Sequence, residues 1–298
     1  DCFASYHLIH SFEVSNMPEF SANGIHLYYE ITGTGYPLLF SHEFAGDYTS
    51  WDAQVRSFSR KYQVITYNAR GYPPSDVPET ANQYSQDHSI DDIKLLLDHL
   101  HIDQAYLCGL SMGGSAVLNF GLRYPHMARA LIVASAGSGS DNPEGFKESG
   151  NTLADKLMSE GMERGIRDYA NGPTRVQLTR KDSKSWLDFY QGLCSHSAIG
   201  SAMTFRGIQL KRPSIYTLES DLHKLTIPTL IMIGDEDEPC IGPAIFMKKH
   251  LPSAGLSVFP QSGHAINLEE PDLFNRTIQE FLHQVESGAW ASFKKSNA

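Results

Sequence analysis

Gly109-Leu110-Ser111-Met112-Gly113 is the stretch that decides the fold of this 298-residue chain. A serine stands between two glycines, each two residues away, which is the pattern of a sharp strand-to-helix turn that exposes a serine hydroxyl. The serine on such a turn has a positive φ, and neighbours without side chains leave room for the tight backbone. The pentapeptide therefore predicts nucleophilic catalysis by Ser111, provided that a strand precedes it and a helix follows it.

The sequence on both sides of the pentapeptide meets that condition. Ala105-Tyr106-Leu107-Cys108 is short, apolar and bounded by glycine, which is typical of a buried parallel strand. From 112 to 123, apolar and polar residues are interspersed as in a helix, and the pattern ends before Pro125. The plain alternative is a glycine-rich turn with a surface serine, which these flanks do not favour.

Strand and helix patterns alternate along most of the chain. Short apolar runs predict strands at 37–41, 63–67, 130–134, 229–233 and 256–259, and Asn23-Gly24 predicts a hairpin over 20–32. Helices are expected at 51–59, at 89–100 and at 272–285. Ser89 would be the N-cap of the second helix, with Asp92 three residues on completing the cap. The alternation predicts an α/β fold, with a parallel sheet covered by helices on both faces.

One region breaks this alternation. Residues 137–222 contain no strong strand pattern, only expected helices at 152–162, 183–194 and 197–206. We interpret 137–222 as a helical cap inserted over the serine, the alternative being a helical excursion without function. The hydrolytic core would then comprise 17–136 and 223–298, preceded by a leader at 1–16 that is either not native or disordered.

Charge and cysteine usage exclude several classes of function. The formal net charge is −10, and no basic run occurs beyond Lys294-Lys295, which disfavours nucleic acid and anionic membranes as partners. No apolar run approaches the roughly 18 residues that cross a bilayer. The four cysteines are scattered without a CxxC spacing, so no disulfide framework is expected. We predict a cytoplasmic monomer or homodimer that acts on a small molecule.

A serine nucleophile needs a base and an acid that orients it. Among 13 histidines, His264 is the best placed, because it lies in a loop between the last expected strand and the last helix. Asp237 is the predicted acid, since the acidic run 235–238 follows a central strand directly. Asp141, which follows the preceding strand, is the alternative acid. A surface-loop histidine and a solvated acidic loop are the plain interpretations.

The third requirement is a pair of backbone N–H groups that bind the oxyanion. One is expected from Met112, the residue after the nucleophile, and the second from Phe44 in the loop 42–46 that follows the strand at 37–41. His42 is expected to order this loop through hydrogen bonds.

With these residues in place, the chain resembles the α/β-hydrolase-fold enzymes over about residues 20–285. The order Ser111, Asp237, His264 along the chain is the order found in that family. The resemblance implies a mostly parallel sheet of eight strands with a helical cap inserted after the sixth.

Two further segments are similar to family motifs, and three positions depart from them. Residues 67–75 are similar to Asp-x-Arg-Gly-x-Gly-x-Ser, and Gly234-Asp235-Glu236-Asp237 is similar to Gly-x-x-Asp. Glu43 stands where a glycine usually follows the histidine, and Asn68 and Pro73 replace the usual Asp and Gly. A carboxylate beside the oxyanion site is unexpected, and Glu43 is therefore a candidate to bind a polar substrate group or a water.

Residue identities narrow the reaction, which the fold alone leaves open. Dehalogenases and epoxide hydrolases of this type use an aspartate in place of Ser111, and carbon–carbon bond hydrolases commonly carry asparagine in place of Leu110. We predict cleavage of a carboxylic ester or lactone through an acyl-enzyme, without a cofactor. The alternatives are an N-acyl-homoserine lactone or enol-lactone lactonase, a carbon–carbon bond hydrolase, a perhydrolase or haloperoxidase, and a ligand receptor.

Two sets of side chains complete the prediction. Glu43, Trp186, Phe189 and Tyr190 are candidate pocket residues, although aromatic residues on helices are as often simply core. Residues 99–103 match three positions of the HxHxDH metal motif, but Gln104 occupies the fourth, so no metal is expected.

Overall fold

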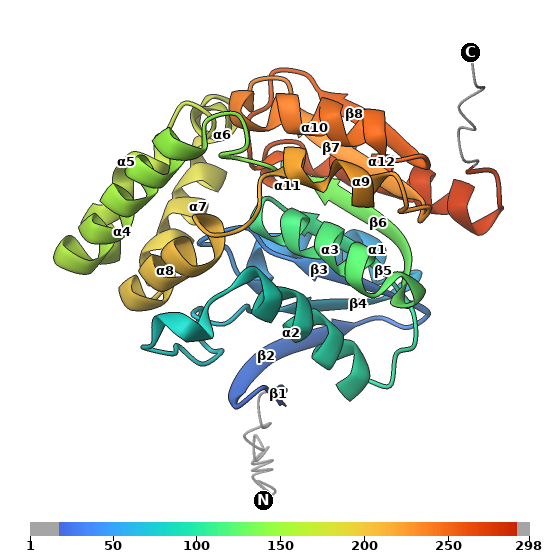
Figure 1. Ribbon diagram of the computed structural model, residues 1–298, viewed down its shortest axis with the longest axis horizontal. Helices are drawn as coiled ribbons and strands as arrows, with labels where there is room; N and C mark the ends of the chain where they lie inside the picture. The colour runs from blue at the N-terminus through green and yellow to red at the C-terminus, as the bar shows by residue number, and fades with distance from the viewer. Residues whose placement is uncertain (1–17, 291–298) are drawn as a thin grey trace, which may run out of the picture.

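The computed structural model describes residues 18–290, and the predicted leader at 1–16 lies outside the described residues. Its centre is an eight-stranded sheet in the order β1-β2-β4-β3-β5-β6-β7-β8 (Figure 1). Strands β3 to β8 are parallel, whereas β2 is antiparallel to β4 and β1 is antiparallel to β2. The predicted mostly parallel sheet of eight strands is confirmed. The strands are β1 Glu19–Ala22, β2 Ile25–Thr32, β3 Tyr36–Ser41, β4 Tyr62–Tyr67, β5 Ala105–Leu110, β6 Ala128–Ala134, β7 Thr229–Gly234 and β8 Ala254–Phe259.

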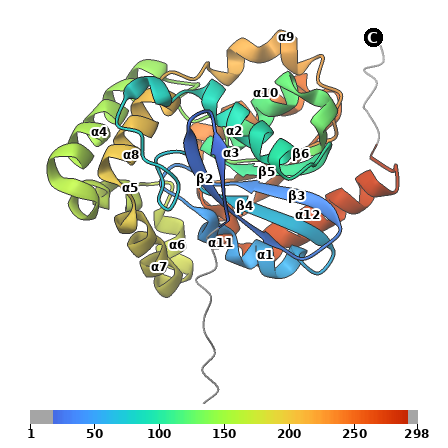
Figure 2. The same cartoon turned by 90° about the horizontal axis from the view of Figure 1, so that it is seen from below.

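Helices cover both faces of this sheet (Figure 2). Helices α1, α11 and α12 lie on one face, and α2, α3 and α10 lie on the other. None of the helices between residues 18 and 290 is long and apolar enough to cross a membrane. The bounds are α1 Asp52–Phe58, α2 Gln86–His99, α3 Met112–Arg123, α10 Glu238–His250, α11 Ile266–Glu269 and α12 Pro271–Glu286, with short turns η1 Tyr48–Trp51, η2 Ala81–Gln83 and η3 Pro125–Met127.

The central strands are apolar throughout because each has two buried faces. In β5, Leu107 belongs to the core cluster under α2 and α3, while Tyr106 and Cys108 belong to the cluster under α1 and α12. Side chains alternate across a strand, so a strand between two helical layers has no solvent face. Burying a large apolar side chain in this way stabilises the fold by about 1.5–3 kcal/mol.

The segment between β6 and β7 contains helices only, as predicted from the missing strand pattern. The helices are α4 Pro143–Gly165, α5 Arg167–Ala170, α6 Val176–Lys181, α7 Ser183–Ser195, α8 Ala198–Thr204 and α9 Glu219–Leu222, with η4 Phe205–Gln209 and η5 Ile215–Leu218. Helices α4 to α8 group beside the sheet, whereas α9 lies near α10 (Figure 1). In η5, the Tyr216 ring packs against Phe246 of α10 at 4.9 Å. We call residues 143–209 the cap, as a name for this helical segment only, and the assignment of 137–222 to a single cap domain stays a prediction.

The start of α2 differs from the expectation. Ser85, not Ser89, is the N-cap, and its hydroxyl accepts a hydrogen bond from the His88 amide at 3.1 Å. Asp92 was expected to complete the cap at Ser89, but its carboxylate instead binds the buried guanidinium of Arg70. Asp92 therefore takes part in a tertiary ion pair and not in the N-terminal cap of α2.

Candidate active site

Ser111 lies on the turn between β5 and α3, at φ 55° and ψ −107°. Its amide donates to the Ala134 carbonyl at 2.8 Å, which ties the turn to β6. A Cβ added at Gly109 would lie 2.2 Å from the Gly113 carbonyl oxygen, and one at Gly113 would lie 2.0 Å from that of Ser41. Both positions therefore require glycine, for the steric reason that the sequence suggested.

His264 and Asp237 meet at the same edge of the sheet, in the loops after β8 and β7. The distance from His264 Nδ1 to Asp237 Oδ2 is 2.8 Å, and the two residues are only 5% and 1% exposed. A proton on Nδ1 donated to the carboxylate leaves Nε2 free to accept another. Asp141, the alternative acid, is instead exposed and accepts a hydrogen bond from the Tyr216 hydroxyl.

The loop after β3 is held by His42, as expected. Ala69 donates its amide to His42 Nε2 at 2.9 Å, so Nδ1 carries the proton and donates to the Glu43 carbonyl at 2.7 Å. Burial lowers the pKa of His42 to about 4, which keeps the ring neutral at neutral pH. The Tyr72 hydroxyl accepts the Ala45 amide at 3.0 Å and orders the other end of the loop.

The two amides predicted to bind an oxyanion are those of Phe44 and Met112. Within residues 18–290, neither N–H donates to a protein acceptor. The Phe44 ring is buried and packs edge-on against Phe205 at 4.8 Å and Tyr169 at 5.4 Å. The cap therefore packs directly on the loop that carries one of these amides.

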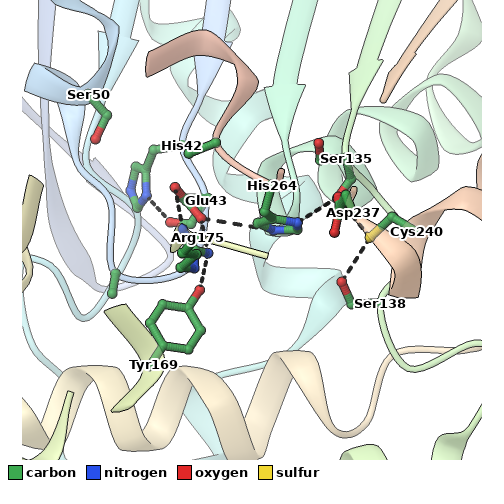
Figure 3. A network of polar contacts seen from close by, with 12 residues as sticks. His42, Glu43, Ser50, Ser135, Ser138, Tyr169, Arg175, Asp237, Cys240 and His264 are labelled. Atoms are coloured by element: carbon green, nitrogen blue, oxygen red, sulfur yellow. Dashed lines mark hydrogen bonds and ion pairs between the residues drawn. The ribbon is translucent and has the colours of Figure 1, made fainter. Parts of the chain in front are cut away.

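Glu43 forms a buried ion pair that the sequence did not predict. Arg175 Nη2 lies 2.5 Å from Glu43 Oε2, and Nη1 lies 3.3 Å from Oε1 (Figure 3). Arg175 also donates to the Tyr169 hydroxyl, and Glu43 Oε2 lies 4.0 Å from His264 Nε2. Burial alone would lower the pKa of Arg175, but the Glu43 carboxylate outweighs it and the pKa is raised.

The departure of Glu43 from the family pattern was the signal that this position is special. Nothing in the sequence marked Arg175, because it is 132 residues away and in the cap. The pair brings one positive and one negative charge to the same place, so the carboxylate near His264 is neutralised.

The cap segment that carries Arg175 also contacts the loops after β7 and β8. The Thr174 carbonyl accepts the His264 amide at 2.7 Å. Gln177 Nε2 donates to Glu236 Oε2 at 2.8 Å, and Arg180 Nη1 lies 3.2 Å from the same oxygen. Glu236, from the acidic run at 235–238, thus holds the cap. Ser111 itself is 5% exposed.

The predicted pocket aromatics on α7 fall into two groups. The Phe189 ring lies 5.4 Å from the Arg175 guanidinium and lines a cavity of about 440 Å³ that also contacts Ala45 and Gly46. Trp186 and Tyr190 stack on each other at 5.4 Å, and each donates to a carbonyl of α4 or α5. These two contacts favour a role in holding the cap helices together. A pocket role for the three residues stays a prediction.

Two groups of side chains within residues 18–290 could supply three ligands to a metal ion. They are Glu219, His223 and His250 at the surface, and Asp237, Cys240 and His264 in the site. The second group shares the hydrogen bond between Asp237 and His264, so a metal there would displace the proton on Nδ1. Of the stretch 99–103, His99 stacks on Phe20 at 5.3 Å and contacts the Tyr29 hydroxyl at 3.2 Å.

Comparison with known proteins agrees with this architecture. Residues 36–271 match the family described as the alpha/beta hydrolase fold. The chain is 26% identical over 250 residues to 3-oxoadipate enol-lactonase 1 of Acinetobacter baylyi, covering 84% of this chain and 89% of the relative. It is 24% identical over 272 residues to a non-heme haloperoxidase of Rhodococcus erythropolis, covering 88% and 97%. A thermophilic esterase from Thermogutta terrifontis superposes with a TM-score of 0.80 at 28% identity, covering 90% and 97%.

Proposed function

The chain belongs to the alpha/beta hydrolase fold family, and on that premise we propose that it is a serine hydrolase of carboxylic esters or lactones. Ser111 is the nucleophile, His264 the general base and Asp237 the residue that orients it. The observation that carries the proposal is the positive φ of Ser111 at the end of β5, at the same edge of the parallel sheet as the His264–Asp237 hydrogen bond in the loops after β8 and β7. That combination presents a serine hydroxyl and a proton acceptor at one edge of the sheet.

In the first half of the reaction, Ser111 Oγ attacks the carbonyl carbon of the substrate while His264 Nε2 takes the hydroxyl proton. The negative charge that develops on the carbonyl oxygen is bound by the amides of Phe44 and Met112, both without a protein acceptor. His264 then gives the proton to the leaving oxygen as the carbon–oxygen bond breaks. The products are an acyl-enzyme and an alcohol, which remains attached to the acyl group when the substrate is a lactone.

In the second half, His264 removes a proton from water, which attacks the acyl-enzyme and releases the acid. The Glu43–Arg175 pair contributes charge balance. A bare carboxylate 4.0 Å from His264 Nε2 would favour the protonated ring and oppose the oxyanion, and Arg175 offsets both effects. In this proposal Glu43 and Arg175 are positioning residues and not reactants.

The ester or lactone class is supported by the chemistry of the nucleophile and by the relatives. An enol-lactonase and an esterase are among the proteins that this chain resembles, and a haloperoxidase shares the same fold family. Cytoplasmic location and action as a monomer or homodimer on a small molecule are part of the same proposal.

Labelling with a serine-directed fluorophosphonate, followed by mass mapping, tests the nucleophile. We expect a single label on Ser111 and none on Ser111→Ala. Label on another serine, or label retained by the variant, would contradict the assignment. A panel of p-nitrophenyl esters, lactones and acyl-homoserine lactones then identifies the substrate class, and a stoichiometric burst without turnover would instead indicate a receptor.

The acid has a matched control in the chain. Asp237→Asn should lower kcat/KM by about 10²-fold or more, because the imidazole loses the group that fixes its tautomer. Asp141→Asn, at the exposed alternative acid, should leave kcat/KM within about twofold of the wild type. Equal losses in the two variants would refute the role of Asp237.

A further inference from the structure

A second cavity, of about 430 Å³, lies between α3, α4 and the segment 209–215. Its charged lining residues are Lys147, Lys211 and Arg212, and no Asp or Glu lines it. The chain as a whole has a formal net charge of −10, so this absence of acids is a local feature. A cavity lined by cations alone has a positive potential and attracts anions.

Arg212 is the central residue of this cavity. Its guanidinium donates to Gln209 Oε1 and, at 2.8 Å, to the Ser138 carbonyl, so three of its five N–H groups remain for a ligand. Arg70 and Arg175 are each paired with a buried carboxylate. Arg212 differs from them, because no carboxylate oxygen within residues 18–290 lies within 4.0 Å of its guanidinium. Burial lowers the pKa of Arg212 to about 10, so the group still carries its charge at neutral pH.

Ser115 and Phe146 also line this cavity. Ser115 is 2% exposed, and its Oγ has no hydrogen-bond partner among the described residues. That oxygen is closed off from solvent, so the cations Arg212 and Lys147 are the groups that a ligand in the cavity would meet. The Phe146 ring, 6.0 Å from the Arg212 guanidinium, closes one side with an apolar surface.

The cavity adjoins the catalytic residues. The Ser115 amide donates to the Ser111 carbonyl at 2.9 Å, so Ser115 is one helical turn from the nucleophile. On the other side, Ser138 Oγ lies 3.0 Å from Cys240 Sγ (Figure 3). That sulfur lies within 4.8 Å of the ligand atoms of Asp237 and His264.

We propose that this cavity binds the carboxylate of a small organic acid, with Arg212 as its main partner and Lys147 as a supporting one. The planar fork of a guanidinium matches the two oxygens of a carboxylate. The anion is either an acid group of the substrate itself, in which case the inference rests on the proposed function, or a separate ligand beside the site.

Calorimetry on the Ser111→Ala protein measures the site without turnover. Succinate is the probe, and succinamide is its neutral counterpart. We expect succinate to bind at least tenfold more tightly than succinamide. Arg212→Gln should weaken succinate binding about 10- to 100-fold, because a charge-assisted hydrogen bond is lost. Arg212→Lys, which keeps the charge without the fork, should retain part of the affinity.

Two lysines of α4 provide a matched pair of controls. Lys147→Ala removes a cation that lines the cavity and should weaken succinate binding about threefold. Lys156→Ala removes a cation that pairs with Asp168 outside the cavity and should change nothing. The Tm of each variant without ligand shows whether it is folded, and a folded Arg212→Gln protein with unchanged succinate affinity overturns the proposal.

Ester kinetics separate the two sources of the carboxylate. If the anion belongs to the substrate, Arg212→Gln raises KM for monomethyl succinate and leaves KM for dimethyl succinate unchanged. If the anion is a separate ligand, Arg212→Gln abolishes succinate binding but leaves the KM values for both methyl esters unchanged. Equal affinity for succinate and succinamide refutes both versions. Because calorimetry does not need turnover, this failure is distinct from a failure of Ser111 to be labelled.

Discussion

The molecule contains two buried arginine–carboxylate pairs with similar chemistry and different surroundings. Arg70 binds Asp92 through Nε at 2.8 Å and Nη2 at 2.7 Å, and the two side chains are 0% and 2% exposed. Arg175 binds Glu43 with side chains that are 4% and 3% exposed. The first pair joins the segment after β4 to α2, whereas the second joins the cap to the loop after β3.

The difference lies in what surrounds each pair. Arg70 also donates to the Gln83 carbonyl at 2.6 Å, and no candidate catalytic group touches the pair. Burial raises the pKa of Asp92, although Arg70 works against that rise. In the second pair, Glu43 instead lies with its Oε2 4.0 Å from His264 Nε2. Two buried ion pairs of similar burial therefore differ in what they can affect, because only the second lies near a proposed catalytic group.

The largest expected effect comes from breaking the pair within the scaffold. Arg70→Gln leaves the Asp92 carboxylate buried without a cation, which should lower the free energy of unfolding by about 3–5 kcal/mol. Activity per folded molecule should stay near that of the wild type. Urea unfolding and active-site titration measure the two quantities. A stable Arg70→Gln protein with reduced turnover would reverse the comparison.

The next effect concerns His42, which orders the loop that carries Glu43. Because burial lowers the folded pKa of His42 to about 4, the unfolded chain takes up a proton first as the pH falls. Stability should therefore fall between about pH 6.5 and pH 4, by about 2 kcal/mol on going from pH 7 to pH 5. His42→Gln should remove this part of the pH dependence in urea unfolding.

His126→Gln is the control for that measurement, because His126 is exposed and should contribute no comparable slope. If the slope persists in His42→Gln and disappears in His126→Gln, the assignment to the buried ring is wrong.

Breaking the pair beside His264 should change catalysis as well as folding, because Glu43 is then also a buried carboxylate without its cation. In Arg175→Gln, the Glu43 carboxylate is no longer neutralised and stabilises the protonated ring of His264. Two other carboxylates face the same ring or its loop: Asp237 binds Nδ1, and Glu269 accepts the amides on either side of His264. The acidic limb of the plot of kcat/KM against pH should therefore shift to a higher pH, by about one pH unit.

The double variant Glu43→Gln with Arg175→Gln removes both charges and should return the limb towards its wild-type position. Arg175→Lys should also return it in part, since the charge is kept. A loss of stability like that of Arg70→Gln, without any change in the pH profile, would make the two buried pairs equivalent.

The smallest effect is expected for an exposed pair between cap and core. Arg180 and Glu236 lie 3.2 Å apart, with side chains that are 65% and 37% exposed. Arg180→Ala should change the free energy of unfolding by less than about 0.5 kcal/mol, because solvent screens such pairs. Thermal and urea unfolding at two salt concentrations measure this. A change above about 1 kcal/mol would show that exposed contacts hold the cap as strongly as buried ones.

Local patterns predicted much of the fold because each depends on few neighbours. The Asn23-Gly24 hairpin, the strand before Ser111 and α3 after it all follow from residues close in the chain. The N-cap of α2 was misassigned because Ser85 and Ser89 both suit a cap locally, and the position of Arg70 decides what Asp92 does. The cap helices were expected, but the packing of η5 on α10 depends on tertiary contacts.

The sequence by itself determined the strained turn at Ser111, the candidate acid and base at the strand ends, and the unusual carboxylate at position 43. These follow from local sterics and from the order of motifs along the chain. Only the tertiary structure decided that Arg175 neutralises Glu43 and that Arg212 has no carboxylate partner among residues 18–290. Pairing of charges far apart in sequence depends on how the cap packs on the sheet, because ion pairs form through space and leave no periodic pattern in the chain.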